Sequence, residues 1–284
     1  MMMNDRDYPI ERCTTPPLKS KVIRTCAENC KSTVTFINDM SSDMAGREKL
    51  VEMLEPDHEI VLFNNRGHFN VSKNRFGRIV QEGDDGTTNV ITDYMPDPKK
   101  CKEIHGIEPY TLDFLVEDTK RILDDHGIEK TDIVGFSLGS FIGQKFAAKY
   151  PERVGKLAIG KAFTKYHDPI QQAKGIMSGP VFKVFYWLWC TSRGDGRGER
   201  EYGCNVPLDI VDEYAKQVIN SDLTKDQLKI ESPTLVIECT DDAIFGTPVQ
   251  HIKNMKKSKV DGCGHVLYNN SDKMYSAVKE FLSD

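Results

Sequence analysis

Apolar residues along the chain fall into short continuous runs that alternate with longer stretches of helical spacing. Runs rich in Val and Ile, as in strands covered on both faces, occupy residues 32–39, 58–67, 132–136, 156–160 and 233–240. Apolar residues at helical spacing occupy residues 41–56, 111–127, the stretch that follows Ser137, and 271–284. Because strands that alternate with crossover helices form parallel sheets, we predict an α/β fold with a mostly parallel, doubly wound sheet.

Two segments interrupt this alternation. Within residues 73–109, the stretch "RIVQEGDDGTTNVITDY" alternates around a Gly-Asp-Asp-Gly turn, which predicts a β-hairpin. Residues 162–229 are mostly helical in pattern and include an aromatic run at 182–189, which predicts a helical cap inserted into the core. The chain therefore divides into a core of residues 1–161 and 230–284, with a hairpin insertion at 73–109, and a cap of residues 162–229.

Composition narrows the possible partners. The 284 residues are 39% hydrophobic and 29% charged, with a net charge of −5 and no long charged block, so we expect neither nucleic acid nor an anionic membrane as a partner. The lysine-rich stretch 253–259 is interpreted as a solvated helix end. No apolar run approaches the roughly 18 residues of a membrane span, and the N-terminus lacks the apolar core of a signal peptide. We therefore expect a cytoplasmic protein; its oligomeric state is not predicted.

The eight cysteines are scattered, and we expect them to be reduced thiols in a cytosol. Cys26 and Cys30 have no second close pair of ligands, so no zinc site is predicted. Cys239 and Cys263 lie close to the acid and base considered below, and two interpretations are open: a catalytic or redox role, or small apolar filler. The filler interpretation is favoured because free cysteine is usually buried and inert.

The candidate chemistry centres on Ser137, which stands between Gly135 and Gly139 where a predicted strand passes into a helix. Small residues there permit close packing of helix on sheet, but the same corner can present a serine as a nucleophile. A serine hydroxyl needs a base to take its proton and an acid to orient that base. Both residue types follow at later strand ends: Asp241 and Asp242 close the strand 233–240, and His265 follows a Gly-Cys-Gly turn.

These motifs carry a resemblance to a known family. From about residue 32 to residue 282, the chain resembles the α/β-hydrolase-fold serine hydrolases, in which the triad follows the order Ser, Asp, His. The similar stretches are "GFSLG", "IVLFNNRGHFNVS", "AAKYPERVGKLAIG" and "DGCGHVLY". The resemblance implies Ser137 as nucleophile and His265 as base. In the family, a glycine ends the strand and the acid follows three positions later. Cys239 stands at the place of that glycine, so the resemblance implies Asp242 as the acid; Asp241 is the reserve candidate.

The resemblance also implies an oxyanion hole formed by the backbone N–H groups of Leu138 and Met40. The loop "NDMSSDM" that contains Met40 replaces the His-Gly of most of the family and resembles the loop of the 3-oxoadipate enol-lactone hydrolases. The Asp39 carboxylate in this loop could repel a developing oxyanion. Haloalkane dehalogenases and epoxide hydrolases of this fold use an aspartate nucleophile, which Ser137 excludes.

The sequence therefore predicts a serine hydrolase, carboxylesterase-like or lactonase-like, that cleaves a small-molecule ester, lactone or thioester without a cofactor or metal. Two alternatives stay open: an acyltransferase, and a slow-turnover receptor or binding protein that keeps the triad. Two interpretations of the hairpin insertion are weighed equally. It packs beside the cap and narrows the entrance to Ser137, or it is a surface feature or dimer contact.

Overall fold

The computed structural model describes residues 20–23, 30–40, 48–66, 71–73, 79–82, 88–90, 110–166, 208–242, 246–263 and 271–284. Among these residues, no helix combines the length and the apolar character that crossing a membrane requires.

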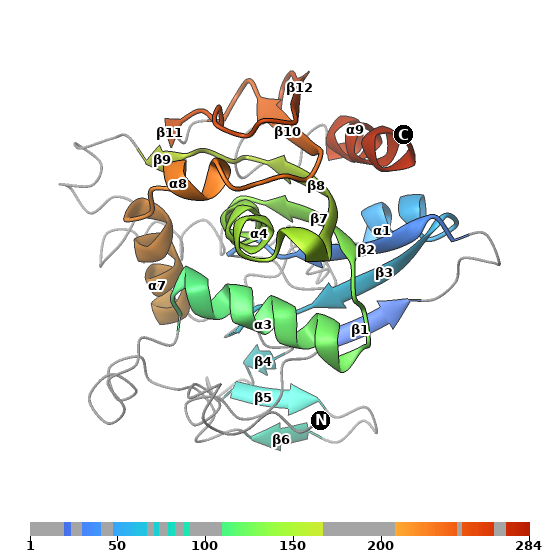
Figure 1. The fold of residues 1–284 in the computed structure, drawn as a ribbon. Helices are drawn as coiled ribbons and strands as arrows, with labels where there is room; N and C mark the ends of the chain where they lie inside the picture. Colours follow the sequence, from blue (N-terminus) through green and yellow to red (C-terminus); the bar gives the residue numbers. More distant parts are fainter. Residues whose placement is uncertain are drawn as a thin grey trace.

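A seven-stranded sheet forms the centre of the molecule, in the order β1-β3-β2-β7-β8-β10-β12 (Figure 1). Strand β1 runs antiparallel to β3, and all other neighbours are parallel. This confirms the predicted α/β fold with a mostly parallel sheet. The strands are β1 (Ser20–Ile23), β2 (Ser32–Ile37), β3 (His58–Phe63), β7 (Thr131–Phe136), β8 (Val154–Gly160), β10 (Thr234–Cys239) and β12 (Met255–Val260).

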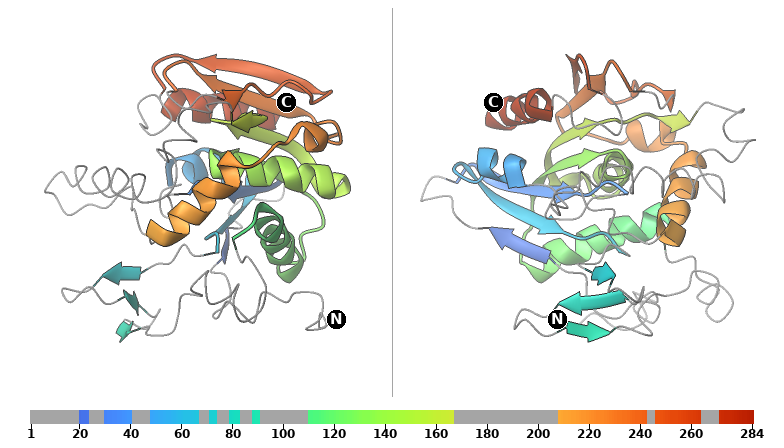
Figure 2. Two further views of the ribbon diagram at one scale, coloured as in Figure 1. Left: turned by 90° about the vertical axis from the view of Figure 1, so that its left-hand side faces the viewer. Right: turned by 180° about the vertical axis from the view of Figure 1, so that it is seen from behind.

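Helices cover both faces of this sheet (Figure 2). On one face, α1 (Glu48–Leu54) and α9 (Ser271–Ser283) share a buried cluster with the strands. On the other, α3 (Leu112–Asp125) and α4 (Leu138–Lys149) do the same. All six residues of the central strand β7 are buried, because both of its faces are covered. The two-sided cover explains why residues 133–136 form a continuous run without alternating polar positions.

Helix α3 has clear start and stop signals. The Thr111 side chain caps its first turn and accepts a hydrogen bond from the Phe114 N–H at 3.3 Å. After its last turn, Gly127 adopts φ of 68°, a conformation that glycine reaches without a steric penalty. Both ends of this predicted helix are therefore set by local sequence.

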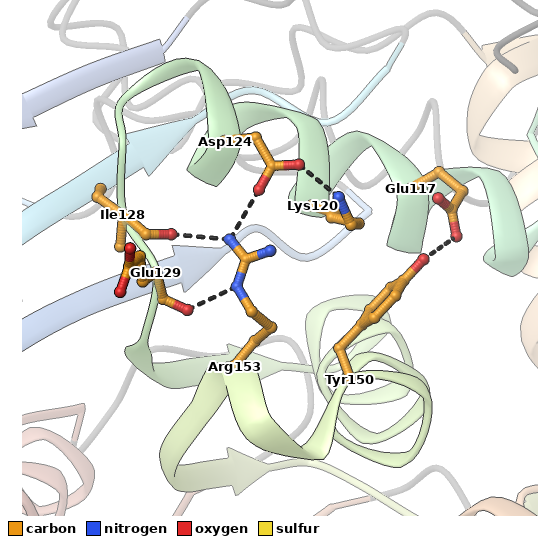
Figure 3. A network of polar contacts seen from close by, with 7 residues as sticks. All are labelled: Glu117, Lys120, Asp124, Ile128, Glu129, Tyr150 and Arg153. Atoms are coloured by element: carbon orange, nitrogen blue, oxygen red, sulfur yellow. Dashed lines mark hydrogen bonds and ion pairs between the residues drawn. The ribbon is translucent and has the colours of Figure 1, made fainter. Parts of the chain in front are cut away.

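A polar network fastens α3 to the end of α4 and to the 3₁₀ turn η3 (Pro151–Arg153) that follows it (Figure 3). The Arg153 guanidinium donates to Asp124 Oδ1 at 2.8 Å and to the Ile128 carbonyl at 2.7 Å. The Tyr150 hydroxyl donates to Glu117 Oε1 at 2.7 Å, and burial together with this carboxylate raises the pKa of Tyr150. The network fixes α3 beside the helix that begins at Ser137.

Shorter elements surround this core. Strands β5 (Ile79–Glu82) and β6 (Thr88–Val90) form an antiparallel hairpin within the segment interpreted as a hairpin insertion. Strand β4 (Val71–Lys73), which ends where that segment begins, pairs with β5 to complete a small sheet at the β1 end of the molecule (Figures 1 and 2). Helices α7 (Leu208–Ile219) and α8 (Thr224–Gln227) come from the segment interpreted as a cap. Strand β9 (Lys165–Tyr166) pairs with β11 (Gly246–Thr247). The aromatic run 182–189 lies outside the described residues.

Two sequence-based expectations were wrong. The lysine-rich stretch interpreted as a helix end is strand β12, which pairs in parallel with β10 at the edge of the sheet. Three of its lysines, at 256, 257 and 259, are exposed, and charged residues on an edge strand hide its hydrophobic pattern while discouraging further pairing. The cysteines are not all reduced either: Cys30 is disulfide-bonded, and its partner lies outside the described residues.

Candidate active site

Ser137 occupies a sharp corner between β7 and α4. Its φ is 52° and its ψ is −121°, a backbone conformation that is costly for a residue with a side chain. Hydrogen bonds hold the corner: the Ser137 N–H donates to the Gly160 carbonyl of β8 at 3.1 Å, and its own carbonyl accepts from the Ser140 N–H at 2.8 Å and from the Ser140 hydroxyl at 2.6 Å. The result is a half-buried serine at a sharp turn between strand and helix.

The two glycines that flank Ser137 are required by close backbone contacts. A Cβ atom on Gly135 would lie 2.3 Å from the Gly139 carbonyl oxygen, and a Cβ atom on Gly139 would lie 2.2 Å from the Ile37 carbonyl oxygen. Both separations are far below an ordinary carbon–oxygen contact of about 3.3 Å. The glycines therefore let α4 begin directly against the end of β2, and the same close packing produces the corner at Ser137.

This contact brings the predicted oxyanion loop to the start of α4. Asn38, which follows Ile37, is buried; its amide donates to the Phe63 carbonyl at 2.7 Å, and its own carbonyl accepts from the Asn65 amide at 2.8 Å. Asp39 is also buried, and Met40 packs against the core from a half-buried position. Leu138 is the first residue of α4, where helix N–H groups and the helix dipole favour negative charge.

The candidate acids lie at the end of β10. The Thr240 hydroxyl donates to Asp241 Oδ1 at 3.2 Å, and Asp241 is exposed. Asp242 is half-buried, and its N–H donates to the Cys239 carbonyl at 3.4 Å in the turn that ends the strand. Since β7 and β10 are parallel members of one sheet, Ser137 and Asp242 follow strands that end at the same edge. His265 lies outside the described residues.

A buried amide network behind Ser137 had no signal in the sequence. Gln227 of α8 donates to Gln144 Oε1 of α4 at 2.8 Å and accepts from the Thr164 hydroxyl at 3.1 Å. Gln144 in turn donates to the Ser140 carbonyl at 3.2 Å. The side chains of Gln144, Gln227 and Thr164 are buried, so these polar contacts connect α4 to α8 and to the residue before β9 in surroundings removed from bulk solvent. Gln144 and Gln227 are 83 residues apart, and only the fold brings them together.

A buried ion pair anchors the turn that follows β3. The Arg66 guanidinium forms two hydrogen bonds with the Asp118 carboxylate of α3, at 2.8 and 2.6 Å, and each side chain is 1% exposed. The hydroxyl of Tyr214 in α7 donates to the Arg66 carbonyl, and burial raises the pKa of Tyr214. Arg66 belongs to the Arg-Gly-His motif; its side chain joins the end of β3 to α3, and its backbone carbonyl joins it to α7.

A second group of serine, histidine and aspartate lies at the opposite edge of the sheet. The Ser32 hydroxyl donates to Asp132 Oδ2 at 2.6 Å and lies 3.0 Å from His58 Nδ1. Here the serine stands between the other two residues, so the histidine is not oriented by the carboxylate and this group is structural. Burial lowers the pKa of His58, whose Nε2 has no hydrogen-bond partner in the described part of the chain.

Comparison with known proteins agrees with this geometry. Residues 40–180 match a family model described as the alpha/beta hydrolase fold. A homoserine O-acetyltransferase of Thermus thermophilus is 43% identical over 65 residues, which are 23% of this chain and 17% of the relative. The matched stretch is thus less than a fifth of that relative's length.

Solved structures match over nearly the whole chain. An enol-lactonase from Burkholderia xenovorans LB400 is similar with a TM-score of 0.66 at 16% identity, covering 94% of this chain and 96% of that one. The α/β hydrolase enzyme MGS-M2, from a Medee basin deep-sea metagenome library, has a TM-score of 0.64 at 20% identity, covering 94% of each chain. Together with the strand order and the corner at Ser137, these matches identify the chain as an α/β-hydrolase-fold protein.

Proposed function

We propose that this protein is a serine hydrolase that cleaves a small carboxylic ester, lactone or thioester through an acyl-enzyme on Ser137. The observation that carries the proposal is the strained corner at Ser137, where the side chain is presented beside the start of a helix. A buried packing serine has no need of such a conformation, whereas a nucleophile does.

The proposed reaction uses groups of the chain itself. His265 takes the Ser137 hydroxyl proton as the oxygen attacks the carbonyl carbon, and Asp242 orients the imidazole. The N–H groups of Leu138 and Met40 donate to the oxyanion that forms. His265 then protonates the leaving group, and water activated by the same imidazole releases the acid. Asp242 is preferred to Asp241 because it is half-buried at the strand end, while Asp241 is exposed.

The direct test of this mechanism is labelling with a fluorophosphonate, followed by mass spectrometry of the labelled peptide. We expect one strongly labelled serine, Ser137, and none in the Ser137→Ala variant. Labelling at another serine, or none, would count against the hydrolase. A panel of short- and long-chain nitrophenyl esters, lactones and acyl-thioesters, with Ser137→Ala as the blank, then defines the substrate class.

An acyltransferase is the second candidate, and the 43% identity to a homoserine O-acetyltransferase favours it. The first half of the reaction is unchanged, and only the acceptor of the acyl group differs. Supplying an acetyl-thioester with and without homoserine separates the two activities. Transfer predicts an O-acetyl product that grows with acceptor concentration at the expense of free acetate, and hydrolysis predicts acetate alone.

A slow-turnover receptor or binding protein is the third candidate, and the buried Asp39 beside the predicted oxyanion loop favours it. A carboxylate there opposes the developing negative charge and would slow each step that forms an oxyanion. Single-turnover mass spectrometry distinguishes this case, because an acyl adduct on Ser137 would persist for many minutes instead of clearing. We propose the cytoplasm as the compartment, and fractionation of the tagged protein tests it.

A further inference from the structure

Three sulfur atoms converge where β10, β12 and α9 meet. Cys263 Sγ lies 3.3 Å from Met274 Sδ, and Cys239 Sγ lies 3.7 Å from the same atom. Neither cysteine is in a disulfide, Cys263 and Met274 are almost fully buried, and Cys239 is half-buried. The cluster thus offers two ionisable sulfurs and one thioether around a single point.

The spacing of these sulfurs suits a bound ion. With metal–sulfur bonds of about 2.3 Å, three sulfurs in a trigonal arrangement lie about 4 Å apart. The observed separations of 3.3 and 3.7 Å would therefore widen by only about 0.7 and 0.3 Å. Thiolate and thioether ligands select soft ions, Cu(I) above all, while Mg²⁺ and Ca²⁺ require oxygen ligands. The described ranges hold no group of three or more His, Cys, Asp or Glu placed to bind a metal, so the third ligand here is the thioether of Met274.

We propose that Cys239, Cys263 and Met274 form a binding site for one Cu(I) ion. Binding forms two thiolate–copper bonds and one thioether–copper bond and releases the two thiol protons to solvent, so that no electron is transferred. The bound ion would join the ends of β10 and β12 to α9. This effect rests on the proposed function: the bound ion would shift the end of β10, and with it Asp242, and would reduce turnover.

The test begins with binding and needs no activity. The reduced full chain competes for Cu(I) with the chromogenic chelator bicinchoninate under anaerobic conditions. We expect wild-type protein to withdraw one more equivalent of Cu(I) than Cys239→Ala or Cys263→Ala. As a matched control, Cys190→Ala removes one cysteine that is not part of the cluster and should bind Cu(I) as the wild type does. Cu(I) should also raise the unfolding temperature of the wild type but not that of Cys263→Ala.

Met274→Leu separates a metal site from a simple pair of thiols. Leucine is close to methionine in volume, so the variant is expected to fold, and losing the thioether should weaken Cu(I) binding roughly tenfold or more. Three results would overturn the site. The first is a Cu(I) affinity in Met274→Leu equal to that of the wild type, and the second is an unchanged number of bound Cu(I) ions in both cysteine variants. The third is nitrogen or oxygen ligands in X-ray absorption of the wild-type complex.

The activity measurement is separate. Cu(I) should slow the wild type several-fold and leave Met274→Leu much less affected at the same concentration. If copper binds as described but the protein hydrolyses nothing, the proposed function fails and the metal site stands. If the protein is an active hydrolase and no copper binds, the metal site alone fails.

Discussion

Adding a single methyl group at Gly139 is expected to disable the nucleophile without unfolding the protein. The new Cβ would lie 2.2 Å from the Ile37 carbonyl oxygen. An ordinary carbon–oxygen contact is about 3.3 Å, so the start of α4 and the end of β2 must separate by about 1 Å. The contacting atom is backbone, which cannot rotate away as a side chain can.

The effect on chemistry should exceed the effect on stability. Overpacking of this kind costs about 1–3 kcal/mol, and alanine recovers up to about 1 kcal/mol through its higher helix propensity. A displacement of about 1 Å between nucleophile and oxyanion donors, however, can cost about 10²-fold in rate. We therefore expect Gly139→Ala to fold, to lose at most about 2 kcal/mol of unfolding free energy, and to react with a fluorophosphonate about 100 times more slowly.

Gly143 in the same helix provides the matched control. A Cβ there would lie 3.3 Å from a methyl group of Ile133 and 3.4 Å from one of Leu157, contacts that small side-chain shifts relieve. Gly143→Ala should keep its labelling rate and gain up to about 1 kcal/mol of stability. Urea unfolding and the second-order labelling rate are the two measurements. If folded Gly139→Ala labels as fast as Gly143→Ala, the corner at Ser137 does not depend on the contact with Ile37 and the reasoning is wrong.

The other predictions concern single residues and one insertion. Asp242→Asn should reduce turnover by about 10⁴-fold, because the imidazole loses its orientation, while Asp241→Asn keeps most of the activity; the reverse order in steady-state assays would exchange the two assignments. Replacing Arg78–Tyr94 with a short Gly-Ser link should change KM or acyl-chain preference at an unchanged fluorophosphonate rate; an unaltered preference in the folded variant would remove the insertion from the site. Asp118→Asn leaves a buried guanidinium without its counter-charge, so urea unfolding should show a loss of about 3–5 kcal/mol, and a loss under about 1 kcal/mol would contradict burial of the pair. Burial lowers the pKa of His58 below its ordinary value of 6.5, so its contribution to stability is complete above pH 6.5 and is lost as the pH falls through the lowered pKa. His58→Gln should therefore flatten the fall of the unfolding free energy with pH on the acid side. An unchanged dependence on pH would contradict a neutral buried imidazole.

Sequence alone predicted what local pattern encodes. Strands β2, β3, β7 and β10 are continuous Val- and Ile-rich runs because both faces of the sheet are covered, and such runs are visible in the letters. The corner at Ser137 was likewise visible, because the glycine spacing reflects two backbone contacts near the serine itself. Strand β12 was missed because lysines occupy its exposed positions at the sheet edge.

The buried polar contacts were not predictable for a different reason. Arg66 and Asp118 are 52 residues apart, and Gln144 and Gln227 are 83 apart, so no local spacing connects them. In the sequence, each of these four polar residues is of a type usually found on the surface, and only the fold shows that its side chain is buried. The sulfur cluster combines both cases: Cys239 and Cys263 stood out beside the predicted acid and base, but Met274 did not, because its role depends on where α9 packs.

The backbone of Ser137 has an evolutionary consequence. A glycine would occupy φ of 52° without the steric cost that the serine side chain incurs, so the molecule would be more stable with glycine at this position. Selection for a durable scaffold alone would therefore remove this side chain by a single substitution. A lineage that no longer needed the hydroxyl would be expected to drift toward glycine there. The serine at this corner is thus a cost in stability, and a role as the proposed nucleophile would give that cost a function.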